Sequence, residues 1–154
     1  MLEFNDISAF LTHMRTVATN LPAVEHRAVE AAAEMIRDEA KAELGTYQEQ
    51  EGPLLGWPEL ADSTKDDRVR LGYTENDPGL REGEMRESIT CTARGNEAAV
   101  GSNDDKLVWF DQGTNTGQPP REVLARAAFR KAEKTAEAIA ARAVWALRGL
   151  RSSS

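Results

Sequence analysis

The chain has 154 residues, of which 40% are hydrophobic and 29% are charged, and its formal net charge is −7. This length predicts a single domain, residues 1–154, that buries most of its apolar surface, and it is too short for two comfortable domains. The one cysteine, Cys91, excludes an intrachain disulfide, and no apolar run is long enough to predict a membrane-spanning helix.

Residues 6–44 predict amphipathic N-terminal helices. Apolar residues recur at three- and four-residue steps from Ile7 to Leu21, and Asn5 or Asp6 can cap the first helix. Pro22 is expected to interrupt or restart the helix, because proline lacks the backbone N–H. A second apolar stripe then continues to Leu44.

Residues 45–84 predict a loop-rich segment. Residues 45–56 are rich in glycine, glutamate and glutamine, which indicates a flexible acidic loop. The charged run at 62–68 supports at most a short helix that ends by Gly72, and residues 73–79 predict another loop.

Residues 85–118 predict a β-rich segment. Residues 88–93 and 98–101 favour two strands joined at residues 94–97, which supply turn residues for a hairpin. Residues 107–110 are a third apolar segment, and their pattern fits either a strand or a single helical turn.

The stretch from Lys106 to Arg121 is expected to position the last helix. Gly113 can adopt a positive φ angle, whereas Pro119 and Pro120 disfavour helix before Arg121. A C-terminal helix is therefore predicted at 121–149.

Two aromatic residues precede this loop, and we expect both Trp109 and Phe110 to belong to the core. A β-branched residue in place of Gly113 is expected to strain the loop more than the core.

The charge is distributed unevenly. Residues 1–60 hold 11 acidic and 4 basic side chains, whereas residues 121–154 hold 3 acidic and 8 basic ones. A basic C-terminal helix on an acidic body can bind nucleic acid, can meet an acidic surface of a neighbouring copy, or can be a solvated helix face.

The sequence predicts no catalytic residue, no cofactor-binding residue and no metal ligand. His13 and His26 have no partner at metal-ligand spacing, and a helix-surface or core-edge role is expected for both. The acidic pairs at 66–67 and 104–105 lack the spacing of a calcium loop, and the glycines at 113–117 are not followed by the lysine of a phosphate-binding loop. Cys91 is expected to be an inert small hydrophobe in a strand.

Five motifs occur in an order that is similar to the tail-completion and virion morphogenesis proteins of long-tailed bacteriophages. They are Trp57-Pro-Glu-Leu60 with Ser63-Thr64, Pro78–Gly83 leading into Met85–Ile89, Ala99-Val-Gly101, Phe110–Thr114, and Pro119-Pro-Arg121 before a final helix. The family pattern usually has a proline and an aromatic residue soon after that arginine, where this chain has Glu122 and Val123.

The resemblance implies an α+β fold with a small antiparallel β-sheet flanked by long N-terminal and C-terminal α-helices, in agreement with the elements predicted above. It implies a virion protein, assembled in the host cytoplasm, that forms a ring, a hexamer, at the neck or tail end and joins tail to head. Its partners would be other copies of itself, neck and tail-tube or terminator proteins, and genomic DNA that passes through the lumen without sequence-specific binding; no membrane is involved. The candidate structural and assembly residues are Trp57, Gly83, Ile89, Trp109, Phe110, Gly113, Thr114, Pro119, Pro120 and Arg121.

Two other functions remain open. A tail terminator, which caps the tail tube, would share the fold class, and the sequence barely separates it from a tail-completion protein. A DNA-binding regulator could use the basic C-terminal helix, but no helix-turn-helix or aromatic and basic platform is present to support this class.

Overall fold

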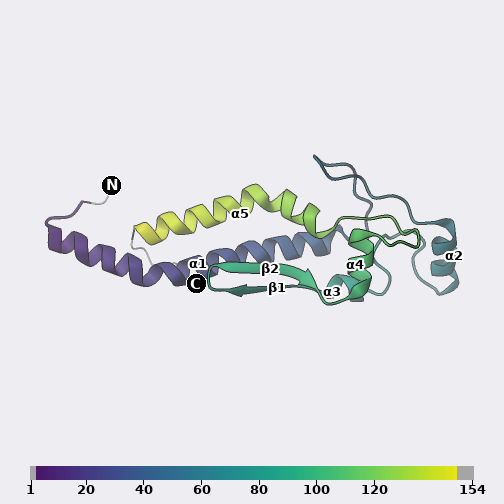
Figure 1. Cartoon of the computed structure of the whole chain (residues 1–154), viewed down its shortest axis with the longest axis horizontal. Helices are drawn as coiled ribbons and strands as arrows, with labels where there is room; N and C mark the ends of the chain where they lie inside the picture. Colours follow the sequence, from purple (N-terminus) through teal and green to yellow (C-terminus); the bar gives the residue numbers. More distant parts are fainter. Residues whose placement is uncertain (1–2, 149–154) are drawn as a thin grey trace. The chain divides into compact units, whose positions relative to one another are not determined.

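The computed structural model describes residues 3–148 and confirms the α+β class. Five helices and one two-stranded antiparallel sheet follow each other along the chain (Figure 1). Their bounds are α1 Ile7–Glu43, α2 Asp62–Arg70, α3 Glu84–Glu87, β1 Ile89–Arg94, β2 Glu97–Ser102, α4 Asp105–Gln112 and α5 Leu124–Leu147.

The chain divides into two compact units. Unit 1 comprises the described residues of Met1–Glu34, Thr92–Ala99 and Ala132–Ser154, and unit 2 comprises Met35–Cys91 and Val100–Lys131. Each unit contains part of α1, of the hairpin and of α5. The single-domain prediction stays a prediction.

The predicted break at Pro22 is wrong, because α1 continues through it for 37 residues. A proline inside a helix removes one hydrogen bond and costs about 3 kcal/mol. Val17 and Ala28, on either side of Pro22, are both buried, and this packing offsets the local cost.

In unit 1, the last half of α5 lies beside α1 and runs antiparallel to it, and the first turns of α1 extend past the end of α5 (Figure 1). Nε2 of His13 donates to the carbonyl oxygen of Leu147 at 2.9 Å, and Arg142 donates to the carbonyl oxygen of Arg27 at 3.0 Å. His26 contacts the carbonyl oxygen of Gly95 in the hairpin turn at 3.0 Å. The two histidines therefore serve packing contacts in unit 1.

The predicted hairpin is confirmed, with Gly95 at a φ of +61° in its turn. The β-rich reading of residues 85–118 needs a correction at its start, because residues 84–87 are the short helix α3. Of the two alternatives for the apolar segment at 107–110, the helical one is confirmed, because the segment is part of the two-turn helix α4. Asp104 caps α4 by accepting a hydrogen bond from the backbone N–H of Lys106, a local signal that favours helix over strand.

Residues 45–57 form a loop without helix or strand, as predicted, but the expected flexibility does not match its packing. The backbones of Glu51 and Leu54 pair as an isolated antiparallel bridge, and Leu54 is buried. Arg126 of α5, itself buried, donates to the carbonyl oxygens of Glu49 and Leu55 at 2.9 and 2.6 Å. The side chain of Arg126, which follows the two bonded residues by 77 and 71 positions, thus holds the loop in place.

The core of unit 2 gathers α1, the loop before α2, β1, α4 and α5. Its buried residues are Ala40, Leu44, Trp57, Ile89, Leu107, Phe110, Val123 and Ala127. Within residues 3–148, no helix is both long enough and apolar enough to cross a membrane.

The predicted start of the last helix at Arg121 is wrong by one turn, because α5 begins at Leu124. Arg121 and Val123, which lie just before the helix, have different roles. Arg121 turns its buried side chain toward the segment before α2, and the backbone N–H of Val123 is bonded by the side chain of Asp111. These tertiary contacts, and not the two prolines alone, set where the helix begins.

Candidate functional site

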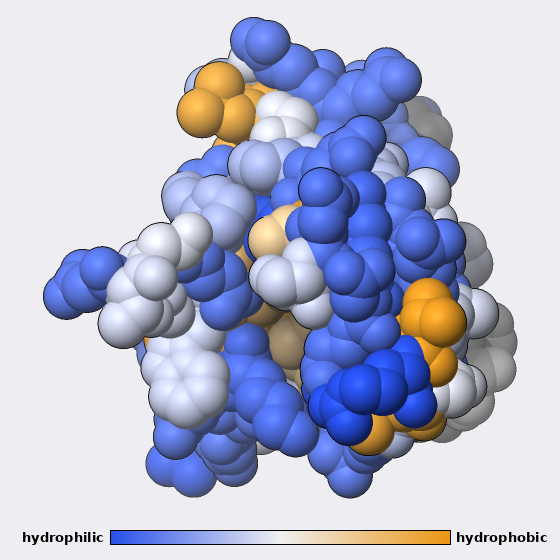
Figure 2. All heavy atoms as spheres, turned by 90° about the vertical axis from the view of Figure 1, so that its right-hand side faces the viewer, coloured by the Kyte–Doolittle hydropathy of each residue, from blue (hydrophilic) through white to orange (hydrophobic). Residues whose placement is uncertain are grey.

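Unit 2 contains an open cleft of about 980 Å³. Figure 2 shows the face that carries α2, which is hollowed near its centre, with hydrophobic atoms at depth between hydrophilic walls. Four segments line the cleft: residues 59–68 around the start of α2, residues 79–85, one side of α4, and the loop at 114–121.

The two aromatic residues of α4 occupy different environments. Phe110 is 6% exposed and contacts the ring of Trp57 edge to face at 5.3 Å. Trp109 is 53% exposed and lines the cleft, so the prediction that it belongs to the core is wrong. On a helix, Leu107 and Phe110 share the buried face at a three-residue step, and Trp109 points about 100° away from Phe110.

Arg121 joins the loop to the opposite wall of the cleft. Its guanidinium donates to the carbonyl oxygens of Pro58 and Glu59, both at 2.9 Å, and lies over the ring of Phe110 at 5.4 Å. Burial lowers the pKa of this guanidinium from its ordinary value. Nε1 of Trp57 donates to the carbonyl oxygen of Glu122 at 3.2 Å, which fixes the same two segments a second time.

The loop at 113–121 is closed by its own hydrogen bonds. The backbone N–H of Thr114 donates to the carbonyl oxygen of Gln118 at 3.0 Å, and the Thr114 hydroxyl lies 3.0 Å from that of Thr116. Gly113 has a φ of +76°, and a Cβ there would lie 2.7 Å from the carbonyl oxygen of Gln118. The predicted need for glycine at 113 is confirmed for the backbone.

Polar contacts surround the cleft. Two are ion pairs, of Lys106 with Glu84 at 3.3 Å and of Arg81 with Asp67 at 2.7 Å, and in a third the Tyr73 hydroxyl donates to Glu82. The arginine hydrogen bonds, of Arg70 first and then of Arg81, hold the pKa of Asp67 below its ordinary value. An apolar floor with a polar rim is the arrangement of a protein interface.

Sequence reasoning missed Arg68, which lies in the charged run at 62–68. Arg68 is buried and donates to the carbonyl oxygens of Thr74 and Leu80, so it ties the loop at 72–79 to α2. The sequence signal for a buried Arg68 is weak. Arg68 directly precedes Val69 and Leu71 near the end of the predicted short helix.

The structure brings six of the ten candidate residues to the lining of the cleft. These are Gly83, Trp109, Phe110, Thr114, Pro119 and Arg121. Trp57 and Ile89 lie in the buried core of the same unit, and Gly113 and Pro120 belong to the loop that forms one wall.

The basic residues at the start of α5 are engaged within unit 2. Arg130 contacts Glu51 at 2.6 Å and Glu39 and Glu43 at 3.5 Å, and Lys131 contacts Glu39 at 2.9 Å. This internal pairing leaves less basic surface for nucleic acid or for an acidic surface of another copy than the charge distribution alone suggests.

Glu43 is the unusual member of this cluster. Its carboxyl is 2% exposed, and Oε2 has no hydrogen-bond partner. Burial raises the pKa of Glu43 to about 8, against the opposing effect of Arg130 and Arg126. The hydrogen bond from Lys131 instead holds the pKa of neighbouring Glu39 below its ordinary value.

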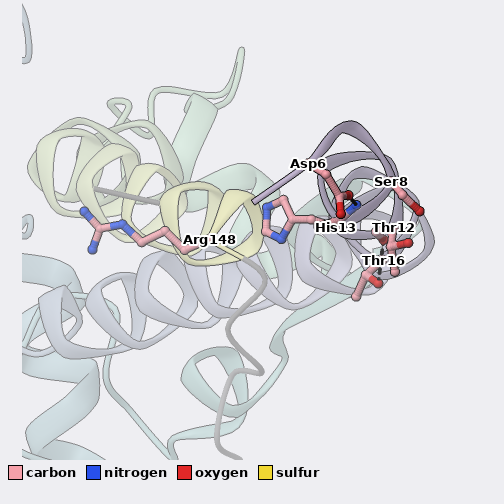
Figure 3. A pocket seen from close by; sticks show the side chains of 7 residues that line it. Asp6, Ser8, Thr12, His13, Thr16 and Arg148 are labelled. Atoms are coloured by element: carbon pink, nitrogen blue, oxygen red, sulfur yellow. Dashed lines mark hydrogen bonds between the residues drawn. The ribbon is translucent and has the colours of Figure 1, made fainter. Parts of the chain in front are cut away.

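A second pocket, of about 590 Å³, lies in unit 1 between the first turns of α1 and the end of α5. Figure 3 shows His13 pointing from α1 toward α5, with Asp6 and Thr12 on the α1 side. Asp6 caps α1, because its side chain accepts a hydrogen bond from the backbone N–H of Ala9 at 2.7 Å. The Thr16 hydroxyl donates to the carbonyl oxygen of Thr12. The polar groups here complete the helix and do not converge on a ligand.

Among residues 3–148, no group of three or more His, Cys, Asp or Glu side chains is placed to hold a metal ion. The cleft of unit 2 is lined by neither histidine nor cysteine. The apolar floor and polar rim of this cleft suit the binding of a protein segment.

Comparison of the chain with models of protein families, with curated proteins and with solved structures found no match.

Proposed function

We propose that this chain is a structural virion protein of a tailed bacteriophage, a tail-completion or neck component that forms a ring joining tail to head. The observation that carries the proposal is the gathering of six candidate residues around one cleft. Four of the five motifs, which are spread from Trp57 to Arg121, contribute residues to its lining, and that is expected if their order reflects a shared assembly role.

The construction of the cleft suits an assembly contact. Its walls are cross-linked by Arg121 and Trp57, its loop is closed by internal hydrogen bonds, and it exposes one large aromatic side chain, Trp109. An aromatic residue that is presented by a rigid scaffold is the usual anchor of a protein interface. In this proposal the cleft receives a segment of a neighbouring virion protein, either another copy in the ring or a tail-tube or terminator protein.

Electron microscopy tests the proposal. The purified protein is expected to form rings, and labelled virions should carry the label at the neck. Trp109→Ala should fold normally yet lose ring formation, whereas Val108→Ala, which changes an exposed α4 residue outside the cleft, should retain it. Wild-type protein that forms no ring and is absent from the neck of virions would contradict the function.

A further inference from the structure

Unit 1 exposes an apolar face that its own core does not use. On α1, Ile7, Leu11, Met14 and Ala18 are all exposed, and Ile7 is 78% exposed. Their spacing of four, three and four residues places them on one strip of the helix. Leu21, the next position of this pattern, is half-buried.

The unit 1 part of α5 carries a matching strip. Ala136, Ile139, Ala143 and Leu147 are exposed and recur at steps of three and four residues. Small residues alternate here with large ones, so that another helix can approach closely at Ala143 and contact large side chains on either side.

Both strips face the same side of the helix pair. On α1, His13 reaches α5 and Val17 is buried, and the exposed strip lies about a quarter of a turn further round the helix. On α5, Thr135 and Ala146 are buried, and the exposed strip again lies about a quarter of a turn further round. Because the helices are antiparallel, equal rotations in the same sense lead to the same side.

The area of this face is that of an interface. Six large side chains on it are between two-fifths and four-fifths exposed: Ile7, Phe10, Leu11, Met14, Ile139 and Leu147. An aromatic side chain has roughly 150–250 Å² of surface and an aliphatic one less, so these six together present several hundred Å² of apolar surface. A standard protein interface buries about 800 Å² on each partner, and single exposed patches on monomers are usually smaller.

We infer that this face pairs with the same face of a second copy, so that α1 of each copy lies on α5 of the other and the two helix pairs form a four-helix bundle. A two-fold axis parallel to the helices produces this arrangement, because it keeps every residue at its own height along the axis. The contact is separate from the cleft of unit 2 and does not rest on the proposed phage function.

The contacts between α1 and α5 place the two strips at the same end of the helix pair. His13 reaches the carbonyl oxygen of Leu147, and Arg142 reaches the carbonyl oxygen of Arg27. Both contacts are satisfied when Leu147 is level with a residue a few positions past His13, at 1.5 Å per residue. Across the two-fold axis, Ala18 of one copy would therefore lie near Leu147 of the other.

The charges favour α1 on α5 over α1 on α1. Residues 3–34 carry five acidic and two basic side chains, whereas residues 132–148 carry two acidic and three basic ones. The proposed axis brings the start of α1, with Glu3 and Asp6, over the end of α5 of the other copy, with Arg148. Each α1 also meets α5 with opposed helix dipoles.

Sedimentation of the full-length protein tests the pairing. Ala18→Glu places a charge in the exposed strip of α1. The variant should show an association constant at least tenfold lower than that of the wild type, and its circular dichroism spectrum should be unchanged. Ala23→Glu changes another exposed alanine of α1, on the opposite side of the helix, and should associate as the wild type does. A monomeric wild type, or an Ala18→Glu protein that associates normally, would overturn the inference.

Disulfide trapping tests which helices meet, and its result does not depend on whether the protein forms rings. In a Cys91→Ser background, Ala18→Cys and Leu147→Cys chains should cross-link under oxidation only when they are mixed. Cross-linking of Ala18→Cys chains with each other, or no cross-link in the mixture, would overturn the α1 on α5 arrangement.

Discussion

The side chain of Asp111, near the end of α4, accepts the backbone N–H of Val123 at 2.7 Å, and its second bond to Leu124, at 3.2 Å, completes a cap on α5. The first N–H groups of a helix have no partner within the helix, and a carboxylate also interacts favourably with the helix dipole there. The cap comes from a different helix, so it links the position of α4 to the start of α5.

Asp111→Ala is therefore expected to reduce the free energy of unfolding by about 0.5–2 kcal/mol, the range for losing a side-chain cap. Urea denaturation measures this loss. Asp111→Asn keeps an oxygen acceptor and should recover most of the stability. An alanine variant as stable as the wild type would show that the cap contributes nothing.

The two aromatic residues of α4 should respond differently to truncation. Phe110→Ala removes a buried ring and should cost about 3–5 kcal/mol. Trp109→Ala removes an exposed one and should cost less than about 1 kcal/mol, because surface substitutions away from special features have small effects. Thermal melts of both variants decide this, and equal losses of stability would contradict the packing described for α4.

Substitutions at Gly113 and Gly117 distinguish the cost of a steric clash from the cost of backbone strain. Both have positive φ, but a Cβ at Gly117 would meet no atom within 4 Å, whereas one at Gly113 would meet the Gln118 carbonyl and Pro120. Gly117→Ala should cost about 1–2 kcal/mol, and Gly113→Ala clearly more. Chemical denaturation of the two proteins compares them directly.

This comparison also revises the expectation for a β-branched residue at 113. The sequence predicts that such a residue strains the loop more than the core, but most of the atoms that its Cβ would meet belong to the backbone of the segment that leads to Arg121. The start of α5 would have to shift, so folding itself should suffer. Gly113→Ala as stable as Gly117→Ala would contradict this argument.

Local patterns in the sequence predicted most of the elements. Apolar periodicity located both long helices, and the turn residues at 94–97 located the hairpin. The errors arose where contacts from distant residues override local preference. Packing around Val17 and Ala28 carries α1 through Pro22, and no rule about proline alone could predict that.

The candidate site was predicted less completely, for a similar reason. Glycine and proline identified the loop at 113–120, because they constrain the backbone wherever they occur. The roles of Arg68, Arg126 and Asp111 depend on backbone groups between 6 and 77 residues away, and no spacing in the sequence marks them. The prediction for Trp109 is wrong because two consecutive residues of a helix point about 100° apart, so that Trp109 and Phe110 do not share one face.

The buried carboxyl of Glu43 gives the fold a pH dependence with a definite sign. Its pKa is about 8 in the folded protein and near 4.5 when the chain is unfolded. Between these values the folded state holds a proton that the unfolded state has released. The contribution of Glu43 to stability is therefore fully present below about pH 4.5 and is lost as the pH rises toward 8.

Glu43→Gln should remove this dependence, because glutamine resembles the protonated carboxyl at every pH. The variant is expected to match the wild type near pH 5 and to exceed its free energy of unfolding near pH 8 by at most a few kcal/mol. Urea denaturation at several pH values measures both.

Glu39→Gln is the matched control, from the same charge cluster. The pKa of Glu39 is lowered by Lys131, so its stabilising contribution is present above the unfolded pKa and is lost as the pH falls. Removing it should destabilise the protein at neutral pH, opposite to the effect of Glu43→Gln at pH 8. If Glu43→Gln instead lost stability between pH 5 and 8 as steeply as the wild type, the burial of an unpaired Glu43 oxygen would not be the cause of the pH dependence.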